Sequence, residues 1–175
     1  MKISIIVAMD EKRGIGKDNK IPWHIREDLI KLKTLTKDHV VILGRKTYDS
    51  MVWYYNKSGK QMPGKLYIVV TRRSLLREGD SLRTNVTVAN SLEEALSFAR
   101  GRLAKLEEKE IFIIGGGQIY QQALSFADKL YLTIVEGDYN CDTFFPDYSA
   151  FKKNIHQESK ESEGYKYKFL ELEKG

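Results

Sequence analysis

Cysteine is almost absent from this chain of 175 residues, in which Cys141 is the only one. A single thiol cannot form an internal disulfide or a cysteine-rich zinc site, so Cys141 is expected to be an ordinary thiol near a strand end. The histidines His24, His39 and His156 lack the HExxH spacing and similar zinc-binding patterns. The sequence therefore gives little support for a metal site.

Long apolar runs are also missing, and no segment approaches the roughly 20 residues that span a membrane. The apolar start at residues 3–9 is too short for the core of a secretion signal and runs directly into charged residues. The 29 basic and 24 acidic residues are mixed along the chain, without a basic arm for nucleic acid. We expect a soluble, cytoplasmic monomer that binds neither membrane nor nucleic acid, and whose mild positive charge suits an anionic small molecule.

No repeat, low-complexity segment or linker divides the chain, so residues 1–175 are expected to form a single domain. Short apolar, β-branched runs predict buried strands at 3–9, 40–43, 66–70, 86–88, 111–114 and 130–135. Helical patterns alternate with these runs, which predicts an α/β fold with a mainly parallel central β-sheet flanked by helices. The tail predicts an antiparallel C-terminal strand pair joined near residues 163–164, with a bulge where the apolar alternation slips after Phe169.

Asp28 stands out because it shares a helix face with apolar residues. Its neighbours at the three- and four-residue helical spacing are Ile25, Leu29, Leu32 and Leu35. Burial of a carboxyl raises its pKa, which makes it a natural general acid or an anchor for a ligand. The alternative is that Asp28 caps a helix that starts one residue later, although Lys31 in place of Glu or Gln excludes a capping box.

Three junctions at predicted strand ends carry groups that suit phosphate: residues 44–47 (Gly-Arg-Lys-Thr), 71–74 (Thr-Arg-Arg-Ser) and 115–117 (three glycines). Each alone could be a tight turn or a loop that is basic by chance, and Tyr120 breaks the GxGxxG dinucleotide pattern. Ligands of open parallel sheets bind beyond the carboxyl ends of the strands, so the three should meet at one edge. Together they predict a long, polyphosphorylated cofactor.

Two segments are interpreted as loops. The polar segment 10–20 is long for a connection inside a compact domain, which favours a functional role. Residues 51–65 lose periodicity, and their adjacent aromatics at 53–55 (Trp-Tyr-Tyr) could form a lid over a ring-shaped ligand or a satellite apolar cluster.

With these residues identified, the sequence resembles the dihydrofolate reductases along nearly its whole length. The resembling motifs are Ile15-Gly16, Ile21-Pro22-Trp23 before Asp28-Leu29, Gly44-Arg45-Lys46-Thr47-Tyr48, Pro63-Gly64, Ile114-Gly115-Gly116-Gly117-Gln118-Ile119-Tyr120, Leu130-Tyr131-Leu132-Thr133 and Asp142-Thr143-Phe144-Phe145-Pro146. Their order and rough spacing match the family. The resemblance implies NADPH-dependent reduction of 7,8-dihydrofolate to 5,6,7,8-tetrahydrofolate by hydride transfer.

The resemblance also implies roles for individual residues, with Asp28, Trp23 and Thr133 as the catalytic set. Asp28 would bind the amidine-like edge of the pterin and favour protonation of the ring nitrogen beside the accepting carbon, with an ordered water able to carry the proton. Thr133 would hydrogen-bond Asp28, Trp23 would help hold the water, and segment 10–20 would close over the nicotinamide. The implied substrate-binding residues are Ile6, Val7, Asp28, Leu32, Met51, Lys65, Ile114, Tyr120 and Thr133. The implied NADPH-binding residues are Ala8, Ile15, Gly16, Ile21, Trp23, Gly44, Arg45, Lys46, Thr47, Val70, Thr71, Arg72, Ile114, Gly115, Gly116, Gly117, Gln118, Ile119, Tyr120 and Thr143.

Two features depart from the family pattern. Lys65 stands where the family usually has an arginine that grips the glutamate tail, and a point charge in place of a bidentate fork predicts weaker folate binding. The segment 52–61 is longer than in compact bacterial enzymes, and we hypothesise that its aromatics compensate by stacking on the tail.

Three competing functions remain for comparison. A reductase of the same fold that acts on a ribosylated pyrimidine should lack the Pro-Trp-x5-Asp-Leu pattern at residues 22–29. A non-catalytic nucleotide-binding protein would not need Asp28 and Thr133. A nucleic-acid-binding module rests only on the net charge and predicts strongly salt-dependent binding to oligonucleotides.

Overall fold

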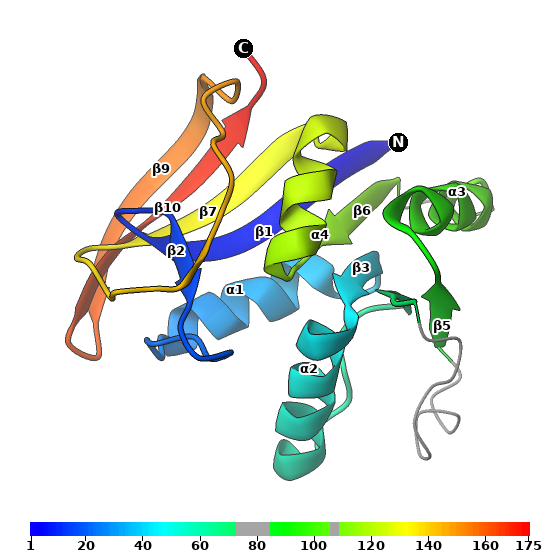
Figure 1. Ribbon diagram of the computed structural model, residues 1–175, viewed down its shortest axis with the longest axis horizontal. Helices are drawn as coiled ribbons and strands as arrows, with labels where there is room; N and C mark the ends of the chain where they lie inside the picture. The colour runs from blue at the N-terminus through cyan, green and yellow to red at the C-terminus, as the bar shows by residue number, and fades with distance from the viewer. Residues whose placement is uncertain (73–84, 106–108) are drawn as a thin grey trace.

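The computed structural model describes residues 1–72, 85–105 and 109–175 and is drawn in Figure 1. Its main sheet has the strand order β5-β4-β3-β6-β1-β7-β10-β9. The strands of that sheet are β1 (Lys2–Asp10), β3 (Val40–Gly44), β4 (Leu66–Val70), β5 (Val86–Ala89), β6 (Glu110–Ile113), β7 (Lys129–Val135), β9 (Lys153–Ser162) and β10 (Tyr165–Glu173). A second, two-stranded sheet pairs β2 (Gly14–Gly16) with β8 (Thr143–Phe144).

The strands from β5 to β7 in this order are parallel to their neighbours, and β10 is antiparallel to both β7 and β9. The predicted fold class is therefore confirmed, including the C-terminal strand pair. A bulge is present between β9 and β10, but it lies beyond the predicted slip after Phe169 and its extra residue is on the partner strand β9. The register of β10 against β9 shifts between Glu171, opposite His156, and Leu172, opposite Asn154, so Ile155 on β9 is the extra residue.

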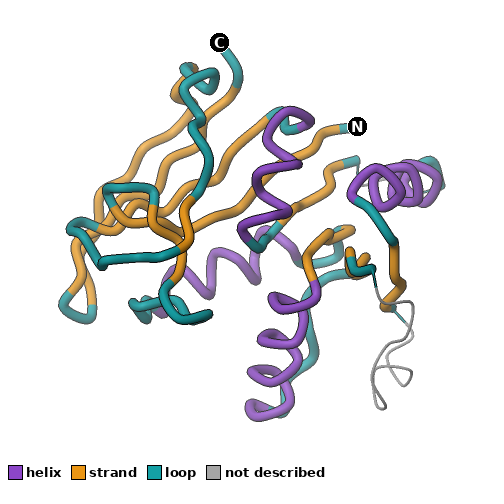
Figure 2. The backbone as a smooth tube through the Cα atoms, in the orientation of Figure 1, coloured by secondary structure: helices purple, strands orange, loops and turns teal. Residues whose placement is uncertain are grey.

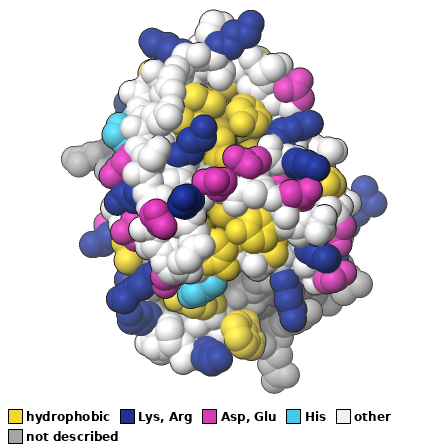
Figure 3. Space-filling model, turned by 90° about the vertical axis from the view of Figure 1, so that its left-hand side faces the viewer, with side chains coloured by type: hydrophobic (Ala, Val, Ile, Leu, Met, Phe, Trp, Pro, Cys, Tyr) yellow, Lys and Arg dark blue, Asp and Glu magenta, His cyan; other side chains and the backbone are white. Residues whose placement is uncertain are grey.

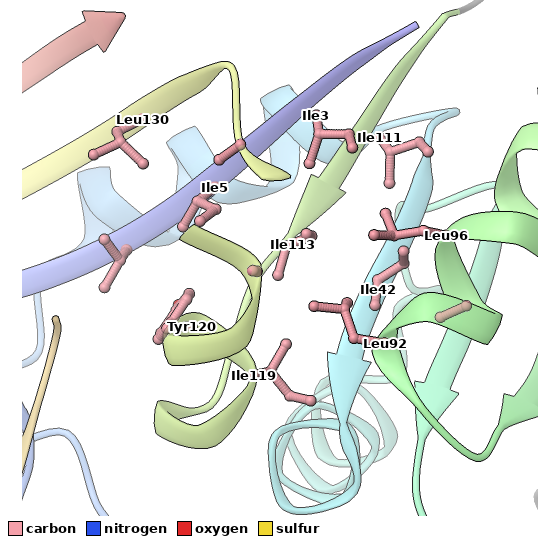
Figure 4. Packing of buried hydrophobic residues seen from close by; sticks show 14 of the residues in the cluster. Ile3, Ile5, Ile42, Leu92, Leu96, Ile111, Ile113, Ile119, Tyr120 and Leu130 are labelled. Atoms are coloured by element: carbon pink, nitrogen blue, oxygen red, sulfur yellow. The ribbon is translucent and has the colours of Figure 1, made fainter. Parts of the chain in front are cut away.

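Helices cover both faces of the sheet, and their bounds are α1 (Arg26–Thr36), α2 (Arg45–Ser58), α3 (Leu92–Leu103) and α4 (Gly117–Ala123), with a 3₁₀ turn at Leu124–Phe126. Because side chains alternate along a strand, the sheet divides the apolar residues into two layers. Residues of α3 and α4 pack with Ile3, Ile5 and Ile113 in the first layer, shown in Figure 4. Residues of α1 and α2 pack on the other face with Val41 and Phe112.

Helix α2 corrects the interpretation of residues 51–65 as a loop, because it continues to Ser58 and ends at Gly59 in the left-handed conformation (φ 70°). Met51, Val52 and Tyr55 repeat at helical spacing and pack on the second apolar layer. Trp53 and Tyr54 lie on the outer side and are 65% and 46% exposed, which hid the periodicity in the sequence.

Helix α1 begins at Arg26, so Asp28 lies inside its first turn and the alternative that Asp28 caps the helix is wrong. Leu29 is 36% exposed and does not belong to the buried face, contrary to the predicted apolar stripe. The buried side of α1 is instead narrower, and it carries Asp28 together with Leu32 and Leu35 toward the sheet. This places a carboxyl between the helix and strand β7.

Candidate active site

Asp28 and Thr133 form the centre of the site. The Thr133 hydroxyl, buried on β7, donates a hydrogen bond of 2.6 Å to the Asp28 carboxylate on α1. The two residues are 105 positions apart in the sequence and meet because α1 lies across the face of the sheet where Tyr131, Thr133 and Val135 point. The structure thus brings together two of the three predicted catalytic residues.

Opposing effects set the protonation of Asp28. Burial raises the pKa of this carboxyl above its ordinary value, and it outweighs the Thr133 hydrogen bond and the positive charge of Lys31, which both lower the pKa. A carboxyl with a raised pKa retains its proton at a higher pH, as a general acid must.

Tyr120 of α4 lies close enough to this acid for their charges to interact. Burial, followed by the negative charge of Asp28, raises the pKa of the Tyr120 phenol, which therefore stays protonated. Its hydroxyl donates a 2.8 Å hydrogen bond to the backbone carbonyl of Ile6 on β1. Tyr120 and Ile6, both predicted to bind substrate, are thereby fixed to each other.

The apolar wall of the predicted ring pocket is only partly as expected. Ile6, Leu32 and Met51 pack against the apolar layer that contains Ile114, on the same face of the sheet as Thr133. Val7 packs instead in the layer under α3 and α4, because neighbouring residues of a strand point to opposite faces. The Val7 side chain therefore does not belong to the wall, which corrects that prediction.

Most of the predicted cofactor residues lie at or after the carboxyl ends of β3, β4 and β6. Gly44 and Val70 are register partners, and the Gly44 amide donates a 2.7 Å hydrogen bond to the Gly115 carbonyl. A Cβ placed on Gly117 would lie 2.8 Å from the Thr143 side chain and 3.9 Å from that of Ile15. The glycines 115–117 thus bring backbone against both the start of α2 and strand β8.

The start of α2 has the features of an anion site. Its N-cap is Gly44, which has no side chain to cap the helix, and a helix N-terminus favours an anion. Lys46 is exposed beside this terminus, and Arg72 is exposed just after β4. The Arg45 guanidinium makes a 3.1 Å ion pair with Asp49 one turn later. A phosphate bound by Arg45 would therefore share the guanidinium with Asp49. Arg73 and Ser74, also part of the predicted phosphate groups, lie outside the described residues.

The segment 10–20 is fastened to the connection after β7, and Figure 2 shows these two stretches side by side. Asp10, which the sequence reasoning missed, is only 1% exposed and accepts hydrogen bonds from the backbone amides of Lys12, Gly14 and Tyr139. The Tyr139 ring packs edge-on against Trp23, with the centroids 5.2 Å apart. A carboxylate at the end of a buried strand was the signal that could have identified Asp10.

Lys65 lies apart from these groups, and Ile21 is largely exposed. Lys65 is exposed at the amino end of β4, whereas the cofactor residues lie at the carboxyl end of that strand. Five residues of strand separate the two ends by about 17 Å, which suits only an elongated substrate. Ile21 is 62% exposed.

On the face in Figure 3, basic and acidic side chains are interspersed. Among residues 1–72, 85–105 and 109–175, no three His, Cys, Asp or Glu side chains group as metal ligands would. None of the helices that the structure describes is both long and apolar enough to cross a membrane.

Comparison with known proteins points to one family. A sequence model of that family, dihydrofolate reductase, matches residues 2–174. The dihydrofolate reductase of Bacillus subtilis is 36% identical over 176 residues, which cover 98% of this chain and 94% of the relative. That of Staphylococcus haemolyticus is 40% identical over 146 residues, which cover 83% of this chain and 77% of the relative. A solved structure of dihydrofolate reductase from Enterococcus faecalis complexed with NADP(H) and RAB-propyl superposes with a TM-score of 0.78 at 25% identity, covering 99% of this chain and 96% of that one.

Proposed function

The chain belongs to the dihydrofolate reductase family, and from this membership we propose that it reduces 7,8-dihydrofolate to 5,6,7,8-tetrahydrofolate by hydride transfer, with Asp28 assisting protonation of the pterin. It is an NADPH-dependent oxidoreductase of folate metabolism. The observation that carries the proposed role of Asp28 is the 2.6 Å hydrogen bond from Thr133 to a carboxyl whose pKa burial raises.

Asp28 has two uses in the proposed reaction. One carboxylate oxygen is occupied by the Thr133 hydroxyl, which fixes the orientation of the group. The second oxygen is left to accept from the amidine-like edge of a pterin, and a protonated Asp28 can supply a proton directly or through a water. Asp28 thus orients the ring and favours its protonation at the nitrogen beside the carbon that accepts hydride.

The residues around the strand ends fit NADPH. When bound, NADPH supplies the hydride. The uncapped first turn of α2, with Lys46 and Thr47, would hold phosphate, and Thr71 with Arg72 would hold the additional phosphate that distinguishes NADPH from NADH. A Cβ on Gly117 would lie 2.8 Å from the Thr143 side chain, whereas one on Gly116 would meet Thr47 at 3.4 Å, an ordinary contact. Backbone at these glycines would lie directly against the cofactor.

Segment 10–20 and Trp23 would exclude water from the reacting rings. Asp10 holds the start of this segment through three backbone amides, and Tyr139 packs on Trp23. A closed, ordered segment over the nicotinamide strengthens the electrostatic effect of Asp28, because charges interact more strongly where water is excluded.

The test is the loss of NADPH absorbance with purified protein and dihydrofolate, comparing wild type with Asp28→Asn. The substitution keeps the size of the side chain and an acceptor for Thr133, but it cannot donate an acidic proton. We expect kcat to fall by about 10²- to 10⁴-fold at pH 7, as for removal of a general acid. NADPH affinity, measured by fluorescence titration, should stay within about twofold of the wild-type value. An Asp28→Asn variant that keeps most of the wild-type rate would overturn the role of Asp28.

A further inference from the structure

Lys31 is a half-buried lysine that the proposed mechanism does not use. It lies three residues after Asp28 on α1, so the two side chains emerge from neighbouring turns on one side of the helix. Its ammonium sits 4.0 Å from the centroid of the Phe169 ring, a distance typical of a cation–π contact. Phe169 is itself 5% exposed, so the aromatic face under the ammonium is buried.

The position of Phe169 connects Lys31 to the centre of the site. Phe169 on β10 is the register partner of Thr133 on β7, and Thr133 donates to Asp28. The four residues therefore lie on adjoining positions of α1, β7 and β10. Phe169 holds the ammonium of Lys31, and its register partner Thr133 holds the carboxylate of Asp28.

The other charged groups around these four residues are already engaged with one another. Lys129 pairs with Glu171 at 3.0 Å, and Lys160 pairs with Glu27 at 3.1 Å and with Glu158 at 3.5 Å. The titratable groups whose charges interact with Asp28 or Lys31 are Tyr120 on α4, Lys129 on β7, Glu158 on β9 and Glu171 on β10. Lys160 on β9, paired with Glu27 on α1, lies 5.9 Å from the centroid of the same Phe169 ring.

We propose that Lys31 is a positioning residue for the proposed reaction: its ammonium, held over Phe169, places a fixed positive charge one helical turn from the Asp28 carboxylate. This inference rests on the proposed function. It is supported by the charge of Lys31, which lowers the pKa of Asp28 against the effect of burial. Burial in turn lowers the pKa of Lys31, while Glu171 and Asp28 oppose that effect.

The experiment compares Lys31→Met with Lys31→Arg. Methionine keeps an unbranched side chain on Phe169 without the charge, and arginine keeps both the charge and the stacking on the ring. Lys33→Met is the matched control, because it removes an exposed lysine from the same helix. For each full-length variant, kcat/KM for dihydrofolate is measured from pH 5 to pH 10, and Asp28 is titrated by carbon-13 NMR in the absence of substrate.

We expect Lys31→Met to move both the Asp28 titration and the alkaline limb of kcat/KM upward by about half a unit or more, since a nearby opposite charge lowers an acid's pKa. On the alkaline limb, this corresponds to about threefold more activity relative to each variant's own acidic plateau. A gain of this kind does not arise from structural damage. Lys31→Arg and Lys33→Met should both stay within about 0.2 units of wild type.

The outcomes separate the two proposals. An Asp28 titration that is unshifted in Lys31→Met, or equally shifted in Lys31→Arg, overturns the role of Lys31 and leaves the proposed function standing. A shifted titration with an unshifted rate profile supports the coupling of Lys31 to Asp28 and overturns Asp28 as the acid of the reaction.

Discussion

Replacement of Thr133 by valine tests the central contact of the site. Valine has nearly the shape of threonine but lacks the hydroxyl that donates to Asp28 at 2.6 Å. The hydrogen bond is made to the ionised form of the carboxyl and lowers its pKa. Its loss must therefore raise the pKa of Asp28 further, because the protonated form loses less than the ionised form.

The magnitude follows from the type of hydrogen bond. A bond to a charged group contributes about 1.5–3 kcal/mol, and one pKa unit corresponds to about 1.4 kcal/mol. We therefore expect Thr133→Val to raise the pKa of Asp28 by about one to two units. The same reasoning predicts a larger loss of unfolding free energy at pH 8, where the ionised carboxylate is left without its donor, than at pH 4.

The assay is a carbon-13 NMR titration of Asp28 together with the pH profile of kcat/KM. Thr133→Ser is the control, since serine keeps a hydroxyl on the same face of β7 and should leave both midpoints within about 0.5 units of wild type. An Asp28 midpoint in Thr133→Val that lies within about 0.3 units of wild type would refute the view that this bond sets the charge state of the acid.

Three further predictions concern the same site. Asp28→Asn should stabilise the folded protein at pH 7 by about 1.4 kcal/mol for each unit by which the wild-type pKa is raised. Because the folded state binds the extra proton, the gain should vanish below about pH 3.9, grow as the pH rises from there and be complete above the pKa of folded Asp28, which urea unfolding at several pH values measures. Gly117→Ala should weaken NADPH binding by about 1–3 kcal/mol in fluorescence titrations, because the added Cβ would lie 2.8 Å from Thr143. The control Gly101→Ala, whose added Cβ would have nothing within 4 Å, should leave NADPH binding unchanged. Lys65→Arg should lower the KM for dihydrofolate at unchanged kcat, as a bidentate fork replaces a point charge on the glutamate tail, and an unchanged KM would show that the tail does not reach this exposed position.

The sequence by itself determined the elements whose burial is uniform. The central strands are nearly continuous apolar, β-branched runs, and such runs report burial on both faces wherever they occur in a parallel sheet. Helix α3 was equally legible, because Ser91 accepts from the Glu94 amide and the following apolar residues share one face. The resemblance of the whole sequence to a known family added the roles of Asp28 and Thr133. No local pattern in the sequence indicates that these two residues contact each other.

Tertiary structure decided the features that depend on a distant partner or on mixed exposure. Helix α2 continues through Trp53 and Tyr54 because only one of its sides packs on the sheet, so exposed aromatics concealed its period. The role of Asp10 depends on the folded structure, in which its carboxylate accepts hydrogen bonds from amides of its own turn and from the amide of Tyr139. Lys31 and Phe169 meet because β10 pairs with β7 beneath α1, and a strand order made by long-range pairing leaves no local trace in the chain. Local sequence patterns indicate how deeply each residue is buried. Which distant residue it contacts is determined only when the strands of the sheet pair.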